Sequence, residues 1–257
     1  MPLTSHPLDE NAHLILDAHH ADPFSYLGPH QCADGSVVVR ALQPFAHTLD
    51  VVLKENGETF CADLCHSNGL FEAKLPASAW GKPYELVTQT QDGKTHRQAD
   101  AYAFGQCLGE LDMHLFREGK HWLLFEHLGA HTKVMDGVAG MQFAVWAPNA
   151  RRVSVIGDFN SWDGRVHSMR CRIEAGIWEI FIPGVGIGAH YKFELIGASG
   201  ELFNKSDPFA FFSQHGIQTS SLTWDYTKYI WRDAAWMEKR LTWDPYHQPM
   251  CIYEVHL

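Results

Sequence analysis

The sequence contains one pattern twice, and this duplication constrains the fold more than any other feature. Four segments of the first half return in the same order about 100 residues later. They are LGPH at 27–30 with LGAH at 128–131, VVVRALQP at 37–44 with MQFAVWAP at 141–148, GLFE at 69–72 with GIWE at 176–179, and DAYAF at 100–104 with DPFAF at 207–211. Solenoid units run about 20–50 residues, whereas a unit of this size matches a whole small domain. The sequence therefore predicts two related domains in tandem.

The composition is that of a folded protein without a basic face. Of the 257 residues 46% are hydrophobic, which suffices for packed cores, and the net charge is -10. This acidic balance argues against nucleic acid and anionic membranes as partners, while neutral partners such as sugars remain open. No basic region precedes an apolar run at the N-terminus, and no stretch approaches 18 apolar residues, so we expect neither a secretory signal nor a membrane span. The six cysteines form no CxxC pair, which favours idle thiols in a reduced cytoplasmic compartment.

Each repeat has the pattern of a β-sandwich. Short alternating apolar runs, among them strands expected at 37–42 and 70–75, are separated by turn residues such as the Asn-Gly and Asp-Gly pairs at 56–57 and 92–93. A short helix capped by Asp9 is expected to open the chain, and Leu108, Leu111, Leu115 and Phe116 indicate an amphipathic helix between the repeats. The fold class is therefore mainly β, with two tandem immunoglobulin-like β-sandwich domains.

The C-terminal part departs from the repeat. A polar and aromatic connector leads to the apolar run MCIYEVHL at 250–257, which has the pattern of a buried strand. We expect such a strand to need neighbours that pair with it and cover it, which suggests that a further domain has been lost.

One turn of the second repeat has the composition of a sugar-binding site. The segment GDFNSWDG at 157–164 surrounds Trp162 with small and polar residues, which can leave an indole face in solvent for stacking on a pyranose ring. Asn160 and Lys192 are the candidates for hydrogen bonds to sugar hydroxyls. The alternative is that Trp162 plugs the edge of the sandwich and that Lys192 is a solvated charge.

Catalytic and metal-binding patterns are not recognisable in this sequence. Glycosidic bond cleavage usually needs two carboxylates across the bond, but the candidate aspartates lie in turns or connectors, namely Asp158, Asp163, Asp207, Asp225 and Asp244. His127 and His131 have i, i+4 spacing, but Gly129 lies between them and no third ligand is evident. We therefore predict no catalytic residue, no cofactor and no metal site in this chain.

Five segments carry a resemblance to a known family. They are HHADPFSYLGPH at 19–30, FAVWAPNARRVSV at 143–155, GDFNSWDGR at 157–165, KSDP at 205–208 and IYEVHL at 252–257. In this order they closely resemble the bacterial glycogen branching enzymes, and the similarity covers essentially the whole chain. That family cuts an α-1,4 glucan chain and rejoins it as an α-1,6 branch. The resemblance implies that this chain is the N-terminal glucan-binding and scaffold part of such an enzyme.

The resemblance also implies a domain layout. We expect a first β-sandwich at 1–107, a helical linker at 108–130, a glycogen-binding-type carbohydrate module at 131–225, a connector at 226–249, and at 250–257 the first strand of a truncated (β/α)8 barrel. A barrel of this type needs about 250 residues. The family's catalytic residues come from later barrel strands, so none can be carried over to this chain.

The module residues can be carried over. In related modules the Trp of the Phe-Asn-x-Trp turn stacks on glucose and a Lys on a neighbouring strand contacts the sugar, and these positions match Trp162 and Lys192. The implied partners are α-glucans (glycogen, amylose, maltooligosaccharides) and the enzyme's own catalytic barrel. Because this module also packs on the barrel in branching enzymes, a structural role for the turn stays open.

Two alternatives to the branching enzyme remain. The chain could be a stand-alone glycogen-targeting or regulatory binding protein, which would require the connector and the last strand to be stably folded. It could also be the N-terminal part of a related debranching enzyme. The first sandwich and the YEVHL segment favour the branching enzyme.

Overall fold

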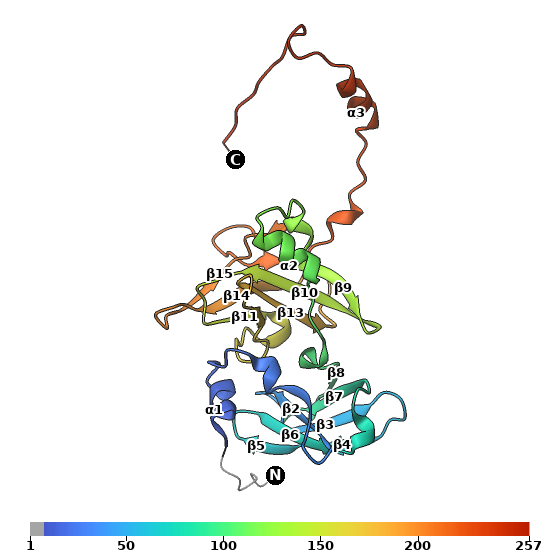
Figure 1. Ribbon diagram of the computed structural model, residues 1–257, viewed down its shortest axis with the longest axis vertical. Coiled ribbons are helices and arrows are strands. Elements are labelled where there is room, and N and C mark those ends of the chain that lie inside the picture. The colour runs from blue at the N-terminus through green and yellow to red at the C-terminus, as the bar shows by residue number, and fades with distance from the viewer. Residues whose placement is uncertain (1–7, 257) are drawn as a thin grey trace. The chain divides into compact units, whose positions relative to one another are not determined.

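The computed structural model describes residues 8–256, and the chain divides into two compact units, Met1–Trp224 and Asp225–Leu257. The first unit contains four antiparallel sheets arranged as two β-sandwiches (Figure 1). Mainly β structure with two immunoglobulin-like sandwiches is therefore confirmed. Within the described residues, no helix has the length and apolar character to cross a membrane.

The first sandwich encloses a core of alternating apolar residues. One sheet has the order β1 (Gly28–Gln31), β2 (Val37–Leu42), β6 (Leu70–Leu75), β5 (Asp63–His66), and the other β4 (Thr59–Cys61), β3 (Thr48–Leu53), β7 (Tyr84–Gln89), β8 (Thr95–Gln98). Val39, Val51 and Phe71 face each other between the two sheets and are fully buried. The period of two that the sequence shows thus puts one face of each strand into the core.

The second sandwich repeats this plan. One sheet has the order β12 (Arg170–Arg172), β13 (Ile177–Pro183), β10 (Val138–Trp146), β9 (Gly129–Met135), and the other β11 (Arg152–Gly157), β14 (His190–Ile196), β17 (Ser221–Leu222), β16 (Phe212–Ser213), with β15 (Leu202–Lys205) also pairing with β14. Phe143, Val155 and Phe193 are fully buried in its core. Strand β14 lies at the centre of the five-stranded sheet, which matters for the site described below.

The duplication extends to individual contacts. Gly28 and Gly129 have φ angles of +85° and +96°, and a Cβ on either would lie within 3.0 Å of a backbone oxygen. In each repeat, the histidine two positions after this glycine donates a hydrogen bond from Nε2 to the carbonyl of the leucine before the glycine. The distance is 3.0 Å from His30 to Leu27 O and 2.8 Å from His131 to Leu128 O. The positive φ angle and the close approach of another backbone explain why only glycine fits the second position of the segments LGPH and LGAH.

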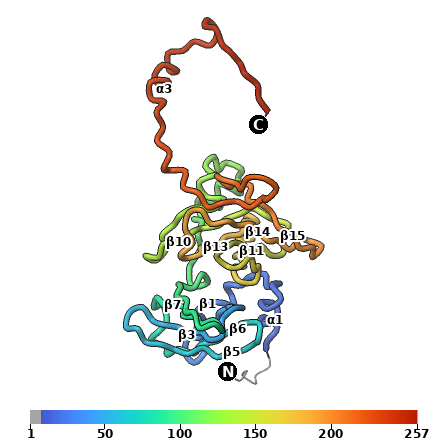
Figure 2. The backbone as a smooth tube through the Cα atoms, turned by 180° about the vertical axis from the view of Figure 1, so that it is seen from behind, coloured from blue at the N-terminus to red at the C-terminus, as the bar shows by residue number. Residues whose placement is uncertain are grey.

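Two helices accompany the sandwiches. Helix α1 (Glu10–Leu16) begins at Asp9, whose carboxylate accepts the Ala12 N–H at 2.7 Å, and it packs on the first sandwich in both views (Figures 1 and 2). Helix α2 (Glu110–Arg117) lies between the repeats as expected, and Leu108 and Phe116 of the expected apolar face pack in one cluster, but Leu111 of that face does not. Met113 is 2% exposed, whereas Leu111 is 68% exposed. The helix is too short for its apolar spacing to define the buried side, so tertiary packing decides it.

The second unit has little regular structure. It contains the short turn η6 (Tyr226–Lys228) and helix α3 (Ala234–Leu241), neither of which has a buried residue. The strand expected at 250–257 does not form, because residues 250–256 belong to no helix or strand and are exposed, while Leu257 lies outside the described residues. A single strand has no partner for its backbone hydrogen bonds, so the apolar pattern alone does not produce one.

Candidate functional site

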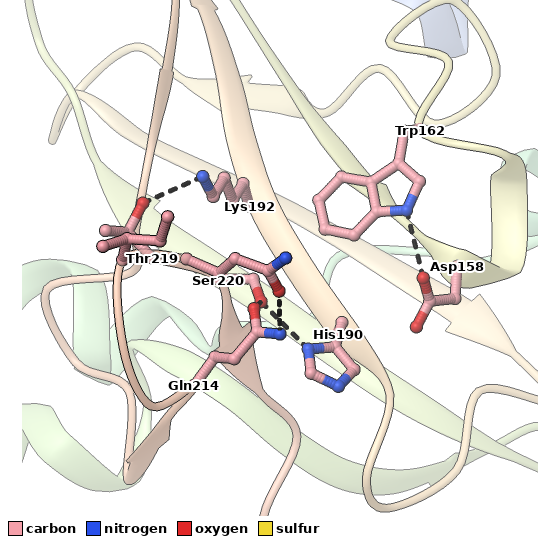
Figure 3. Close-up of a pocket in the computed structure, with 9 residues that line it drawn as sticks. Asp158, Trp162, His190, Lys192, Gln214, Thr219 and Ser220 are labelled. Atoms are coloured by element: carbon pink, nitrogen blue, oxygen red, sulfur yellow. Dashed lines mark hydrogen bonds between the residues drawn. The ribbon is translucent and has the colours of Figure 1, made fainter.

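A pocket of about 560 Å³ opens on the five-stranded sheet of the second sandwich. It lies between the turn that follows β11 and the loop that joins β16 to β17, with β14 as its floor (Figure 3). Its lining residues are Asp158, Trp162, His190, Lys192, Gln214, Ile217, Gln218, Thr219 and Ser220. The mixture of one indole with amide, hydroxyl and charged groups is typical of a site for a polar small ligand.

The turn after β11 is held in an unusual conformation by Asn160. Ser161 and Trp162 have φ angles of 55° and 59°, in the left-handed region that non-glycine residues rarely adopt. The Asn160 Oδ1 accepts the Gly157 N–H at 2.9 Å, and its Nδ2 donates to Val155 O at 2.8 Å. Asn160 is 6% exposed, so these bonds form in the interior, where they are difficult to replace by bonds to water.

A partly buried histidine completes the support of this turn. The Nδ2 of Asn160 lies 2.9 Å from Nδ1 of His167. Burial lowers the pKa of His167 from 6.5 to about 4. At neutral pH the ring is therefore uncharged, and its Nδ1 accepts the amide hydrogen of Asn160.

Trp162 is presented at the rim of the pocket. The Nε1 of its indole donates to Asp158 Oδ1 at 3.0 Å, which fixes the ring orientation, and 39% of the residue is exposed (Figure 3). An exposed and immobilised indole has lost its rotational freedom before a ligand arrives. Stacking of an apolar sugar face on it therefore costs less conformational entropy.

Strand β14 and the β16–β17 loop supply the polar side of the pocket. His190 and Lys192 point to the pocket because residues two apart on a strand share a face, while Tyr191 between them is buried in the core. Lys192 Nζ donates to Thr219 Oγ1 at 2.9 Å, and Nδ1 of His190 lies 2.9 Å from Ser220 Oγ. These side chains offer both donors and acceptors to ligand hydroxyls (Figure 3).

The pocket has the chemistry of binding and not of glycosidic bond cleavage. Asp158 is the only carboxylate among its described lining residues, and its Oδ1 is occupied by the indole N–H. Acid-base cleavage of a glycosidic bond needs a second carboxylate across the bond. Two other candidate aspartates act in turns, since Asp225 accepts the Thr227 N–H and Asp244 accepts the Tyr246 N–H.

The structure brings together two of the three residues that the sequence suggested. Trp162 and Lys192 line the same pocket, whereas Asn160 does not line it and holds the turn from below. The geometry therefore assigns Asn160 to positioning of the turn instead of the expected contact with a sugar. His190 was missed although it lies two residues before Lys192 on the same strand, an alternation that the sequence does show. The loop 214–220 has no periodic pattern, so its contribution could not have been found from the sequence.

The two histidines with i, i+4 spacing have different environments. The ring of His131 bonds the Leu128 carbonyl, and burial is the main cause that lowers its pKa. His127 instead lies beside Asp112 and His121. The three side chains form the one group among the described residues whose ligand atoms lie close enough together for a metal ion.

Two family models match the chain in succession. Residues 9–102 match the N-terminal domain of the alpha-1,4-glucan branching enzyme GlgB. Residues 127–210 match carbohydrate-binding module 48, the isoamylase N-terminal domain. The second match includes Trp162 and Lys192 but ends before the loop 214–220.

Curated relatives are similar over nearly the whole chain. A 1,4-alpha-glucan branching enzyme GlgB of Paramagnetospirillum magneticum is 47% identical over 96% of this chain, and one of Gloeobacter violaceus is 47% identical over 93%. The matched parts make up 33% and 32% of those proteins, so the chain spans about a third of the length of the curated relatives it matches.

Similarity to solved structures is more distant. A pullulanase from Anoxybacillus sp. LM18-11 matches 78% of this chain and 28% of its own, with 15% identity and a TM-score of 0.34.

Proposed function

Because the chain corresponds to the N-terminal third of the GlgB branching enzymes and carries their N-terminal domain followed by a carbohydrate-binding module, we propose that it binds α-glucan through the pocket of its second sandwich. The observation that carries the proposal is the immobilised and exposed indole of Trp162 opposite Lys192 in one pocket. The indole stacks on a glucose ring, and Lys192, His190 and the hydroxyls of the loop bond its hydroxyl groups.

The ligands that fit this chemistry are glycogen, amylose and maltooligosaccharides. These glucans are uncharged, so the net charge of -10 does not oppose their binding. The pocket is open on one side of the sheet, which lets a chain of several glucose units pass over it. Stacking on the indole needs only one exposed sugar face and does not require a chain end.

We assign glucan binding to this chain and catalysis to a separate domain. The curated relatives are named as 1,4-alpha-glucan branching enzymes, and this pocket has a single carboxylate, Asp158, among its described lining residues. The chain supplies glucan binding and a scaffold for a catalytic barrel, which forms the α-1,6 branch. The sequence-based division into 1–107, 108–130, 131–225, 226–249 and 250–257 remains our proposal for its domains.

Affinity electrophoresis of the chain in gels with and without glycogen tests this proposal. We expect glycogen to retard the wild-type chain and to retard the Trp162→Ala variant much less, because the variant loses the stacking surface. Trp80→Ala is the matched control, since Trp80 is also about half exposed but belongs to the first sandwich and lies outside the pocket. Equal retardation of wild type and Trp162→Ala would contradict the pocket as the binding site. Failure of both glycogen and amylose in the gel to retard the wild type would contradict glucan binding by this chain.

A further inference from the structure

The chain segment that connects the first sandwich to the second holds a cluster of metal-ligating side chains. None of these side chains lines the proposed glucan pocket. Asp112 lies on α2, His121 follows that helix, and His127 ends the short turn η4 (Leu124–Glu126). Both imidazoles approach one carboxylate oxygen. Nε2 of His121 lies 3.1 Å and Nε2 of His127 lies 3.5 Å from Oδ1 of Asp112. Three ligand atoms from the single segment 112–127 thus converge.

We propose that Asp112, His121 and His127 form a binding site for a divalent transition-metal ion, with Zn²⁺ as the preferred ion. Two imidazole nitrogens and one carboxylate oxygen are a donor set that suits Zn²⁺. With ligand bonds of about 2.0–2.2 Å, neighbouring ligand atoms of a tetrahedral site lie about 3.3 Å apart. The observed distances of 3.1 and 3.5 Å to Asp112 Oδ1 lie on either side of this value, and all three ligand atoms lie within 4.8 Å of one another.

The ligands are held in place by contacts outside the cluster. The other carboxylate oxygen of Asp112, Oδ2, accepts the Gly109 N–H at 3.1 Å, which leaves Oδ1 for the two imidazoles. The His127 carbonyl accepts a hydrogen bond from Nε2 of Gln142 on β10 at 2.9 Å, and Leu128 is buried in the adjacent core. The side chain of His121 is 5% exposed. Such support reduces the reorganisation that metal binding requires.

A bound ion would replace the direct contact between His121 and Asp112. Imidazole ligates Zn²⁺ through a ring nitrogen that carries no hydrogen, so each Nε2 would offer its lone pair to the ion. Three protein ligands leave the fourth position of a tetrahedral Zn²⁺ site to water.

Isothermal titration calorimetry with Zn²⁺ alone, in a buffer that does not chelate it, tests the site. We expect one Zn²⁺ ion per wild-type chain and an affinity at least about 100-fold lower in His127→Gln and in Asp112→Asn, because each loses a direct ligand. His114→Gln is the matched control: His114 lies on α2 like Asp112, but its ring is exposed and contacts Glu118. This control should bind Zn²⁺ as the wild type does.

Two further readouts separate the site from adventitious binding by other histidines. Co²⁺ in place of Zn²⁺ should give the visible absorption of a tetrahedral site in the wild type and in His114→Gln, and not in the other two variants. Zn²⁺ should also raise the unfolding temperature of the wild type relative to a sample with EDTA. This comparison is made within one protein, so it holds even where a substitution lowers stability. Equal Zn²⁺ affinity in wild type and His127→Gln, or no stoichiometric binding by the wild type, would overturn the proposal.

Discussion

The best evidence at the scale of single residues for a duplicated domain is a buried Tyr–Asp pair that occurs once in each sandwich. Tyr84 donates its hydroxyl hydrogen to Asp100 Oδ2 at 2.7 Å, and Tyr191 donates to Asp207 Oδ2 at 2.5 Å. The other oxygen of each aspartate accepts a hydrogen bond from the backbone N–H two residues later. The donor is Tyr102 for Asp100 and Phe209 for Asp207. Burial raises the pKa of both aspartates from 3.8 to about 6.

This shift predicts that stability falls as the pH rises from about 4 to about 6. Below pH 3.8 both folded and unfolded chains carry the proton on Asp207. Between 3.8 and about 6 the unfolded chain ionises first, so folding becomes less favourable, and above about 6 the loss is constant. The shift corresponds to a loss of about 3 kcal/mol for each aspartate. Asp207→Asn removes the share of this pH dependence that comes from Asp207. Between pH 3.8 and about 6, the free energy of unfolding of the wild type should therefore fall by about 3 kcal/mol more than that of the variant.

Urea unfolding at several pH values between 3.5 and 7, with roughly one-unit steps, measures this difference. Asp100→Asn should behave as Asp207→Asn does. Asp92→Asn is the control of opposite sign, because hydrogen bonds from Lys94 and Thr90 lower the pKa of Asp92. A free-energy difference between wild type and Asp207→Asn that does not change with pH would show that Asp207 titrates as an ordinary carboxyl group.

At the scale of elements, the turn after β11 and strand β14 contribute to the proposed glucan pocket in different ways. Asn160 is buried and bonds the backbone of the turn, whereas Lys192 on β14 reaches the pocket with its ammonium group. We expect Asn160→Ala to lower the free energy of unfolding by about 1–3 kcal/mol, because it leaves the Gly157 N–H and the Val155 carbonyl without partners. Its glycogen affinity should fall as well, since the left-handed residues that present Trp162 lose their support.

Lys192→Ala provides the contrast. The ammonium group bonds Thr219 at the surface, so its loss should change the free energy of unfolding by no more than about 0.5 kcal/mol while glycogen affinity falls. Urea unfolding and glycogen affinity electrophoresis on both variants separate the two roles. An Asn160→Ala chain of wild-type stability, or a Lys192→Ala chain of wild-type affinity, would show that the corresponding role is assigned incorrectly.

The sequence predicted those elements whose pattern is local. Strands β2 and β6 were expected with the bounds that the structure has, because alternation and glycine-containing turns define them without reference to the rest of the chain. The exposure of Leu111 on α2 was not predicted, and residues 250–256 form no strand in this chain, since both features depend on what packs against the segment. In the pocket, Trp162 and Lys192 could be found from motif and spacing. The partners of Asn160 and the loop 214–220 could not, because they depend on contacts between distant segments.

At the scale of the whole molecule, the two units differ in their cores. The first unit has two sandwich cores and several smaller clusters of buried side chains. In the second unit, η6 and α3 bury no residue, and large apolar side chains such as Trp231 and Tyr246 are exposed. Without a core, the second unit gains little stabilisation from burial and should open far more often than the first.

This difference predicts the course of limited proteolysis. Lys228, Arg232, Lys239 and Arg240 all lie in the second unit, so trypsin should remove that unit first and leave a resistant fragment that ends near Lys228. Mass spectrometry of the early products identifies the cut sites, and glycogen electrophoresis tests the fragment. Every lining residue of the pocket belongs to the first unit, so the fragment should be retarded by glycogen as strongly as the intact chain. Early cuts within the sandwiches would contradict the assignment of low stability to the second unit. A fragment that is intact up to Lys228 but no longer binds glycogen would show that the glucan site extends beyond the pocket.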